Sequence, residues 1–432
     1  MALLAVFAPL LTGLLTGRAQ FSVEFGAPIL VGGSNTTHFW FPASVLQLGA
    51  GPSSSATVLQ GVSRHGDGRT DPKSATGATL QTRDGGNSYQ SVPAVGSFPL
   101  VPEDPVFSKR AHNQDNFSSL NNFHCANASC SGDVVRWNAS LQPMKYLALH
   151  VDGVSSVVAL AVDGERPIML RDGSVLLATY GFASDAPRTC SKEMPEQKCY
   201  SIFFFALPKP SAEQTSWEYV GRIDHTPAMS ARGATVEGPC EPAIVQLPGN
   251  DDRVLSVFRV NSFTSHWAAI SKNGGRDWGI PFPTKNTWAV APNLVALPSG
   301  AIVLTSGRPG VGLWVTSFPS LTSDAHTWDY YNVLAAHNAQ VGQPAYAYPE
   351  VDTGVENASS HDSSWIVNSA NPHGSRDMSR ASSTAYTGLI ALDDETLLLS
   401  YDRLASGWSG PPGRLGDSDR VFAMRVKIKP IG

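Results

Sequence analysis

The chain has 432 residues, 42% of them hydrophobic and 16% charged, so it is long and apolar enough to bury a sizeable core. Its formal net charge of -5 and its lack of a basic cluster exclude a general polyanion binder, and we expect no nucleic-acid partner. The 39 glycines and 31 prolines are scattered without a collagen period, which favours many short strands joined by turns.

The beginning of the chain resembles a secretory signal. Residues 2–17 are apolar and uncharged, and Gly17 and Ala19 are placed like the small residues that precede a cleavage site. We expect residues 1–19 to be a signal peptide and 20–432 to be one mature domain, with no membrane span once the leader is removed. A membrane anchor is the alternative, although the apolar stretch is short for a span.

Glycosylation sequons favour a secreted or extracellular protein, although one sequon alone is weak support. There are five, at Asn35, Asn116, Asn127, Asn138 and Asn357. We therefore expect the protein to be secreted or to be located in the secretory pathway.

Close spacing predicts disulfides between Cys125 and Cys130 and between Cys190 and Cys199. Cys240 is then left over, and a buried free thiol is the simplest interpretation. No cysteine or histidine cluster has metal-ligand spacing, so we expect neither a metal nor a cofactor.

Short apolar runs separated by turn residues predict an all-β chain, because helical periodicity is nearly absent. The clearest runs are 154–162, 174–180, 200–207, 254–260 and 396–401. Two polar or loop-like stretches, 105–140 and 332–383, are interpreted as an insertion and as a lid or rim.

A hairpin pattern repeats along the chain, with an apolar run, a Gly or Asp turn and a second apolar run. It is clearest at 168–178 and 294–304, with looser copies at 43–51, 244–258 and 389–399. Recurring hairpins of this kind indicate the blades of a β-propeller, which gathers its loops around a central axis.

Two tight turns, Thr82–Tyr89 and Ser271–Trp278, share the form Ser/Thr-x-Asp/Asn-x-Gly-x-x-aromatic. Polar side chains can bond the turn backbone, and glycine permits the dihedral angles that the turn needs. The turns resemble the Asp-box (BNR repeat) of the sialidase (neuraminidase) superfamily. The resemblance covers roughly residues 39–428 and implies a six-bladed propeller with loop insertions.

Three further stretches carry the resemblance to the sialidases. Cys240-Glu-Pro and a strand ending in Arg259 imply that Glu241 activates the nucleophile and that Arg259 binds a substrate carboxylate; Glu237 is a possible substitute for Glu241. The strand ending in Gly307-Arg308 implies a second carboxylate-binding arginine, with Arg376 and Arg380 as alternatives.

The third stretch, 383–402, implies that Tyr386 is the nucleophile, although a core tyrosine is the plainer interpretation. Guanidinium groups hold a carboxylate in bidentate fashion. A neutral phenol, deprotonated by a nearby Glu, suits attack on a sugar that carries a carboxylate at its anomeric carbon.

The leaving oxygen needs an acid, and the loop before the first turn motif offers Asp71, with Asp67 as second choice. Such loop acids are often only turn formers. Trp40 stands where the family has its first carboxylate-binding arginine; it would line the pocket, and Arg64 or Arg69 would have to replace the missing cation.

The resemblance implies an enzyme, a sialidase-like exo-glycosidase that releases a terminal acidic sugar from a glycan or glycoconjugate. Two alternatives stay open. One is a non-catalytic propeller that binds glycans or proteins, for which Trp40 would offer a stacking surface. The other is a glycosidase for a different sugar.

Overall fold

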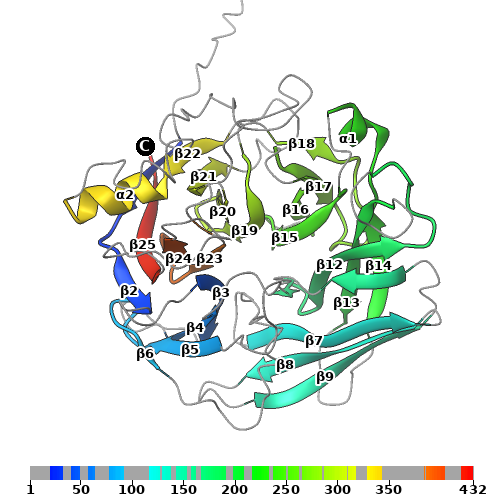
Figure 1. Cartoon of the computed structure of the whole chain (residues 1–432), viewed down its shortest axis with the longest axis horizontal. Coiled ribbons are helices and arrows are strands. Elements are labelled where there is room, and N and C mark those ends of the chain that lie inside the picture. The colour runs from blue at the N-terminus through cyan, green and yellow to red at the C-terminus, as the bar shows by residue number, and fades with distance from the viewer. Residues whose placement is uncertain are drawn as a thin grey trace, which may run out of the picture.

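The computed structural model describes residues 20–32, 40–48, 57–63, 77–91, 116–126, 129–137, 143–152, 157–161, 167–190, 198–208, 217–232, 237–249, 252–261, 265–284, 287–308, 310–317, 328–342, 384, 386–403 and 420–431. Within these residues the strands form six antiparallel sheets, which Figure 1 shows arranged around a central axis. The predicted six-bladed β-propeller is confirmed.

The sheets follow chain order as blades 1 to 6. Blade 1 holds β3 (Trp40–Leu48), β4 (Thr57–Ser63), β5 (Gly77–Thr82) and β6 (Gln90–Ser91), and blade 2 holds β7 (Asn116–Ala126), β8 (Ser129–Trp137) and β9 (Pro143–Asp152). Blade 3 holds β10 (Val157–Ala161), β11 (Ile168–Met169), β12 (Val175–Ala183), β13 (Tyr200–Leu207) and β14 (Glu218–Ile223).

Blade 4 holds β15 (Cys240–Gln246), β16 (Val254–Arg259), β17 (Trp267–Ser271) and β18 (Phe282–Pro283). Blade 5 holds β19 (Val290–Ala296), β20 (Ala301–Gly307), β21 (Val311–Ser317) and β22 (Asp329–Asn332). Blade 6 holds β23 (Thr387–Ala391), β24 (Thr396–Arg403), β25 (Arg420–Pro430), β1 (Phe21–Phe25) and β2 (Ile29–Gly32). Blades 1, 4 and 5 therefore have four strands, whereas blade 2 has three and blades 3 and 6 have five.

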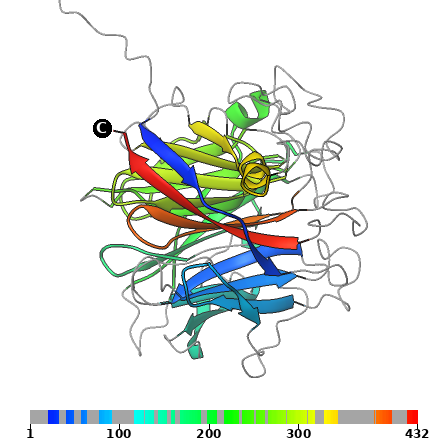
Figure 2. The ribbon, with the colours of Figure 1, turned by 90° about the vertical axis from the view of Figure 1, so that its left-hand side faces the viewer.

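The two ends of the chain close the ring. β1 pairs along its whole length with β25, from Phe21 opposite Pro430 to Phe25 opposite Val426. Figure 2 shows β1 in blue alongside β25 in red. The last blade is thus completed by the first strand, which leaves β23 as its innermost strand, next to β3 of blade 1.

The core lies between neighbouring blades. Leu176 and Phe204 of blade 3 pack with Phe258 of blade 4, and Leu399 of blade 6 packs in one cluster with Val303 of blade 5. Strands in the middle of a blade are covered on both faces, which is why β13 reads as one continuous apolar run. The packing of blade against blade places the starts of the inner strands around the axis.

The polar stretch 105–140 was wrongly interpreted as an insertion. Residues 116–126 and 129–137 form β7 and β8, which pair with each other and, through β8, with β9. Their Asn- and Ser-rich sequence hid the strands, because β-propensity reflects the packing of a strand more than its backbone.

The two turn motifs have the same hydrogen bonds. Thr82 Oγ1 accepts from the N–H of Gly86 at 2.9 Å, and Ser271 Oγ accepts from the N–H of Gly275 at 2.9 Å. Each turn leads from the third strand of its blade to the fourth. The polar residues therefore hold the turns, as their spacing predicts.

The two helices of the described residues are short: α1 (Pro227–Ala231) and α2 (Val333–Gln340). No helix in the described ranges is long and apolar enough to cross a membrane. Helix α2 forms the beginning of the stretch 332–383 that was predicted to be a lid or rim, and residues 343–383 lie outside the described residues. The leader and the asparagines of four of the five sequons also lie outside the described residues.

One predicted disulfide is present, between Cys190 and Cys199, and Cys240 is buried and free as expected. Burial raises the pKa of the Cys240 thiol well above its ordinary value, so the thiol is protonated at neutral pH. Cys125 stands opposite Cys130 in the pairing of β7 with β8, but the side chains there are not described, and that disulfide stays a prediction.

Candidate functional site

The inner strands of blades 4 and 5 both begin with a break in their pairing. In blade 4, Cys240 pairs with Arg259 and the next pair is Ala243 with Val257, so Glu241 and Pro242 are skipped. Proline has no N–H to give to a ladder, and such a bulge re-aims the residue beside it. Glu241 takes a left-handed φ of 48°, which turns its side chain out of the regular alternation.

Blade 5 repeats this break at Ala291-Pro292, between the pairs Val290–Gly307 and Asn293–Thr305. Ala291 has a φ of 47°, nearly that of Glu241. The pairing of β3 in blade 1 also shifts at Pro42, just after Trp40. An X-Pro pair at the start of an inner strand is therefore a repeated device that the sequence shows, though it was not singled out there.

Arg259 is buried between two carboxylates. Its Nε and Nη2 lie 2.8 and 2.9 Å from the two oxygens of Glu241, and its Nη1 lies 2.9 Å from Glu237 Oε2. Burial opposes the charge of the guanidinium, yet the negative groups around it hold the pKa of Arg259 well above its ordinary value. Glu237 therefore lies at the same cation as Glu241, and the choice of Glu241 over Glu237 as the base stays a prediction.

Backbone and histidine complete the surroundings of Glu241. The N–H of Ala291, from the next blade, donates to Glu241 Oε2 at 2.8 Å. The imidazole of His266 is fully buried, and its Nε2 lies 2.8 Å from the carbonyl oxygen of Ala289. Burial lowers the pKa of His266 to about 4, so the ring is neutral at pH 7 and serves as a hydrogen-bonding group.

Arg308 and Tyr386 meet at the junction of blades 5 and 6. Arg308 follows β20 with a φ of 52°, and its guanidinium carbon lies 5.2 Å from the centre of the Tyr386 ring, a cation–π arrangement. Tyr386 directly precedes β23. The hydroxyl of Thr384 donates to the buried carboxylate of Asp402, which ties the Tyr386 segment to the end of β24.

The structure thus forms two pairs from the sequence-predicted residues, Glu241 with Arg259 and Arg308 with Tyr386. A direct hydrogen bond between the Tyr386 hydroxyl and Glu241 stays a prediction. Trp40 is placed at the start of β3, but its side chain is not described. The predicted acid Asp71 and the alternatives Asp67, Arg64, Arg69, Arg376 and Arg380 lie outside the described residues.

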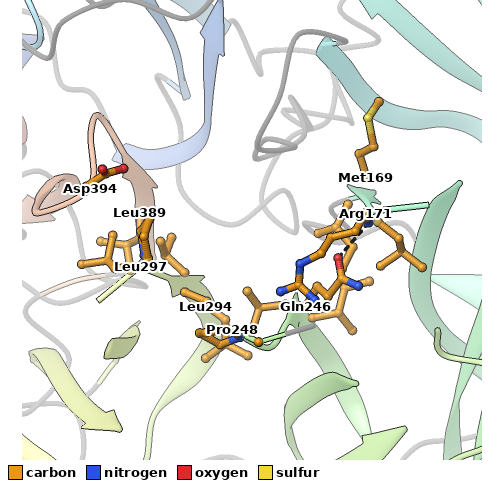
Figure 3. A pocket seen from close by; sticks show the side chains of 16 residues that line it. Met169, Arg171, Gln246, Pro248, Leu294, Leu297, Leu389 and Asp394 are labelled. Atoms are coloured by element: carbon orange, nitrogen blue, oxygen red, sulfur yellow. Dashed lines mark hydrogen bonds between the residues drawn. The ribbon is translucent and has the colours of Figure 1, made fainter. Parts of the chain in front are cut away.

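A cavity of about 500 Å³ lies elsewhere in the molecule (Figure 3). Figure 3 shows Leu297, Leu389 and Asp394 on one side of it and Met169 and Arg171 on the other. Its walls begin at Ile244 on β15 and Leu294 on β19, three residues beyond Glu241 and Ala291, which at 3.3 Å per residue is roughly 10 Å along each strand; none of Glu241, Arg259, Arg308 and Tyr386 lines it. The cavity is therefore distinct from the acid and arginine cluster.

One group in the described ranges has the residue types of a metal site. The ligand atoms of Cys190, Cys199 and His225 lie within 4.8 Å of one another and are buried. The two sulfurs are joined in a disulfide, so they are not the thiolates that zinc requires. We assign no metal to this group.

No protein-family model matches this chain, and no curated protein matches it. Among solved structures it is similar to the GH93 alpha-L-arabinofuranosidase of Fusarium graminearum, in complex with arabinobiose, at 12% identity and a TM-score of 0.51 over 93% of this chain and 97% of that one. It is also similar to the Trypanosoma rangeli sialidase (9%, TM-score 0.46, 95% and 60%) and to the fucose-binding fungal lectin of Aleuria aurantia (10%, TM-score 0.36, 67% and 77%). At these identities the first likeness establishes the propeller fold, and the activity has to be argued from the site.

Proposed function

We propose that this protein is a retaining exo-glycosidase whose active site lies where the inner strands of blades 4 to 6 begin. One observation carries the proposal: Glu241 is held by the buried Arg259, and Tyr386 lies under Arg308 in the neighbouring cluster. A buried carboxylate and a buried guanidinium are costly unless they compensate each other. Glu241 and Arg308 also have left-handed backbone, and such strain is typical of a functional site.

In the proposed reaction the oxygen of Tyr386 attacks the anomeric carbon and Glu241 takes the phenolic proton. The bond to the leaving oxygen breaks, and Asp71 gives that oxygen a proton. Water then attacks the anomeric carbon and gives a proton to Asp71, while the glycosyl–tyrosine bond breaks and the tyrosine oxygen takes back the proton held by Glu241. Two displacements at one carbon retain its configuration, which is the outcome that defines this class.

The resemblance favours a terminal acidic sugar, whose carboxylate would bind Arg308 and share Arg259. A neutral sugar is the second candidate, because the three nitrogens of Arg259 already face Glu241 and Glu237. Trp40 in place of an arginine also favours a neutral sugar. The arabinofuranosidase of similar fold makes a neutral furanoside a sensible member of the test panel.

The test is hydrolysis of a fluorogenic sialoside beside neutral glycosides, arabinofuranosides included. We expect the wild-type chain to cleave one class, Tyr386→Phe to lose at least about a thousandfold in kcat, and Glu241→Gln to lose about 10²- to 10⁴-fold. Tyr331→Phe is the matched control, because Tyr331 lies on β22 and keeps its ring contact with Phe25. Glycan binding without turnover would support the binding module instead, and a fully active Tyr386→Phe would remove Tyr386 as nucleophile.

We also propose that the protein is secreted after cleavage near Ala19. The disulfide between Cys190 and Cys199 supports an oxidising compartment. N-terminal sequencing of material from the medium should start near Gln20, and a start at Met1 would contradict this proposal.

A further inference from the structure

Asn293 joins two blades through its side-chain amide. It is fully buried on β19, and its Nδ2 lies 3.0 Å from the carbonyl oxygen of Ala291 in its own blade. The same nitrogen lies 3.0 Å from the carbonyl oxygen of Thr387 and 2.9 Å from the Thr387 hydroxyl, both on β23 of blade 6. An amide nitrogen has two hydrogens, so one of them is shared between the two Thr387 oxygens.

The two residues that accept hydrogen bonds from Asn293, Ala291 and Thr387, are each next to a residue of the candidate site. Ala291 gives its N–H to Glu241 Oε2 at 2.8 Å. Thr387 is the residue after Tyr386. A continuous path therefore runs from Glu241 through Ala291, Asn293 and Thr387 to Tyr386.

The blade architecture does not demand an asparagine here. The break at Ala291-Pro292 repeats the break at Glu241-Pro242, and the residue that follows in blade 4 is Ala243. Ala243 is buried in the apolar core beside Val257, so a small apolar side chain satisfies this position of a blade. A buried polar side chain is retained where its hydrogen bonds have a purpose.

We infer that Asn293 is a positioning residue that fixes Glu241 relative to Tyr386, and this inference rests on the proposed function. The bond to Ala291 oxygen holds the strained residue whose N–H binds the general base. The bond to Thr387 fixes the backbone next to the nucleophile. Misplacement of such a pair by about 1 Å costs on the order of 10²-fold in rate, even when the binding of the substrate is unchanged.

The experiment compares Asn293→Ala, which installs the residue of blade 4, with Asn293→Asp, which keeps the shape but removes the donor. We expect kcat to fall about 10²-fold in both variants with KM changed less than about threefold, as for an interaction made only in the transition state.

Thr305→Val is the matched control. Thr305 pairs with Asn293 and is equally buried, but its hydroxyl donates to the carbonyl of Gly312 at 2.8 Å and not across blades. We expect this variant to lose stability while kcat and KM stay unchanged. If both Asn293 variants keep the wild-type kcat, or if Thr305→Val reproduces their loss, the inference is wrong.

Wild-type protein and Tyr386→Phe in the same assay separate the two proposals. An inactive wild type, or an active Tyr386→Phe, overturns the proposed function and the role of Asn293 with it. An active wild type with an inactive Tyr386→Phe and unaffected Asn293 variants overturns the role of Asn293 alone.

Discussion

Replacing Arg259 by methionine removes one cation from between two buried carboxylates. The side chains of Arg259 and Glu241 are 9% and 8% exposed, and that of Glu237 is 17% exposed. Methionine keeps the length of the stem but leaves both carboxylates without their cation. Breaking a buried ion pair by removing one partner costs about 3–5 kcal/mol, because the remaining charge is uncompensated.

Arg222 provides the matched control, since it also lies between two acids. Its nitrogens are 2.7 Å from Asp185 and 2.8 Å from Asp224, but the three side chains are 21%, 60% and 34% exposed. Exposed pairs contribute about 0–1 kcal/mol, because water screens them. Arg222→Met should therefore cost far less than Arg259→Met, although both changes remove the same chemical group.

The assay is urea unfolding of the wild type and both variants at pH 7.5, in which we expect Arg259→Met to lose about 3–5 kcal/mol and Arg222→Met about 0–1 kcal/mol. Equal losses for Arg222→Met and Arg259→Met, or a loss below about 1 kcal/mol for Arg259→Met, would refute the account of a buried, mutually compensated cluster.

Two further predictions concern the buried imidazole and the turn glycines. The pKa of His266 is about 4 in the folded chain against 6.5 for an ordinary histidine, so the unfolded chain binds a proton first as the pH falls. The free energy of unfolding should therefore drop by roughly 3 kcal/mol between pH 6.5 and 4. This drop should be absent in His266→Gln when unfolding is followed across the same pH range. A Cβ at Gly275 would lie 2.4 Å from Leu176 Cδ2, whereas at Gly173, with a similar φ of 84° against 85°, it would meet nothing within 4 Å. Gly173→Ala should therefore lose only the stability that an alanine costs at a left-handed φ, about 1–2 kcal/mol, whereas Gly275→Ala should lose clearly more because of the clash. Equal melting temperatures for the two variants would contradict the clash.

The sequence was sufficient for most of the blades because their strands are bounded by strong turn signals. The run 200–207 predicts β13 to the residue, and the hairpin at 294–304 corresponds to β19 and β20. Blade 2 was missed because the Asn- and Ser-rich stretch of β7 carries little apolar signal. That strand is specified by pairing with β8, which is a contact that local sequence does not encode.

For the candidate site, the sequence indicated one contact and missed several of the groups around it. Glu241 and Arg259 were placed on one hairpin, and they are in contact. The role of Glu237 at the same guanidinium was not predicted, because it depends on how the chain enters β15. The Ala291 N–H was missed because a backbone donor has no residue type, although the X-Pro pair at Ala291-Pro292 is visible in the sequence. The Asn293 side-chain amide was missed because its partner Thr387 lies 94 residues away in the sequence.

The backbone strain of the molecule argues for a functional site independently of any resemblance. The described residues with left-handed φ, glycines aside, are Glu241, Ala289, Ala291 and Arg308, all in blades 4 and 5. Each such residue costs on the order of 1–3 kcal/mol and persists only where its surroundings hold it. Here the holders are the groups of the candidate site: Arg259 binds Glu241, His266 binds the carbonyl of Ala289, and Glu241 accepts from Ala291. Packing of blade against blade asks for none of these conformations, because the regular pairing resumes at the following residues. The strained residues therefore lie where the chemistry is proposed, and the packing of the blades offsets the free energy that these conformations cost.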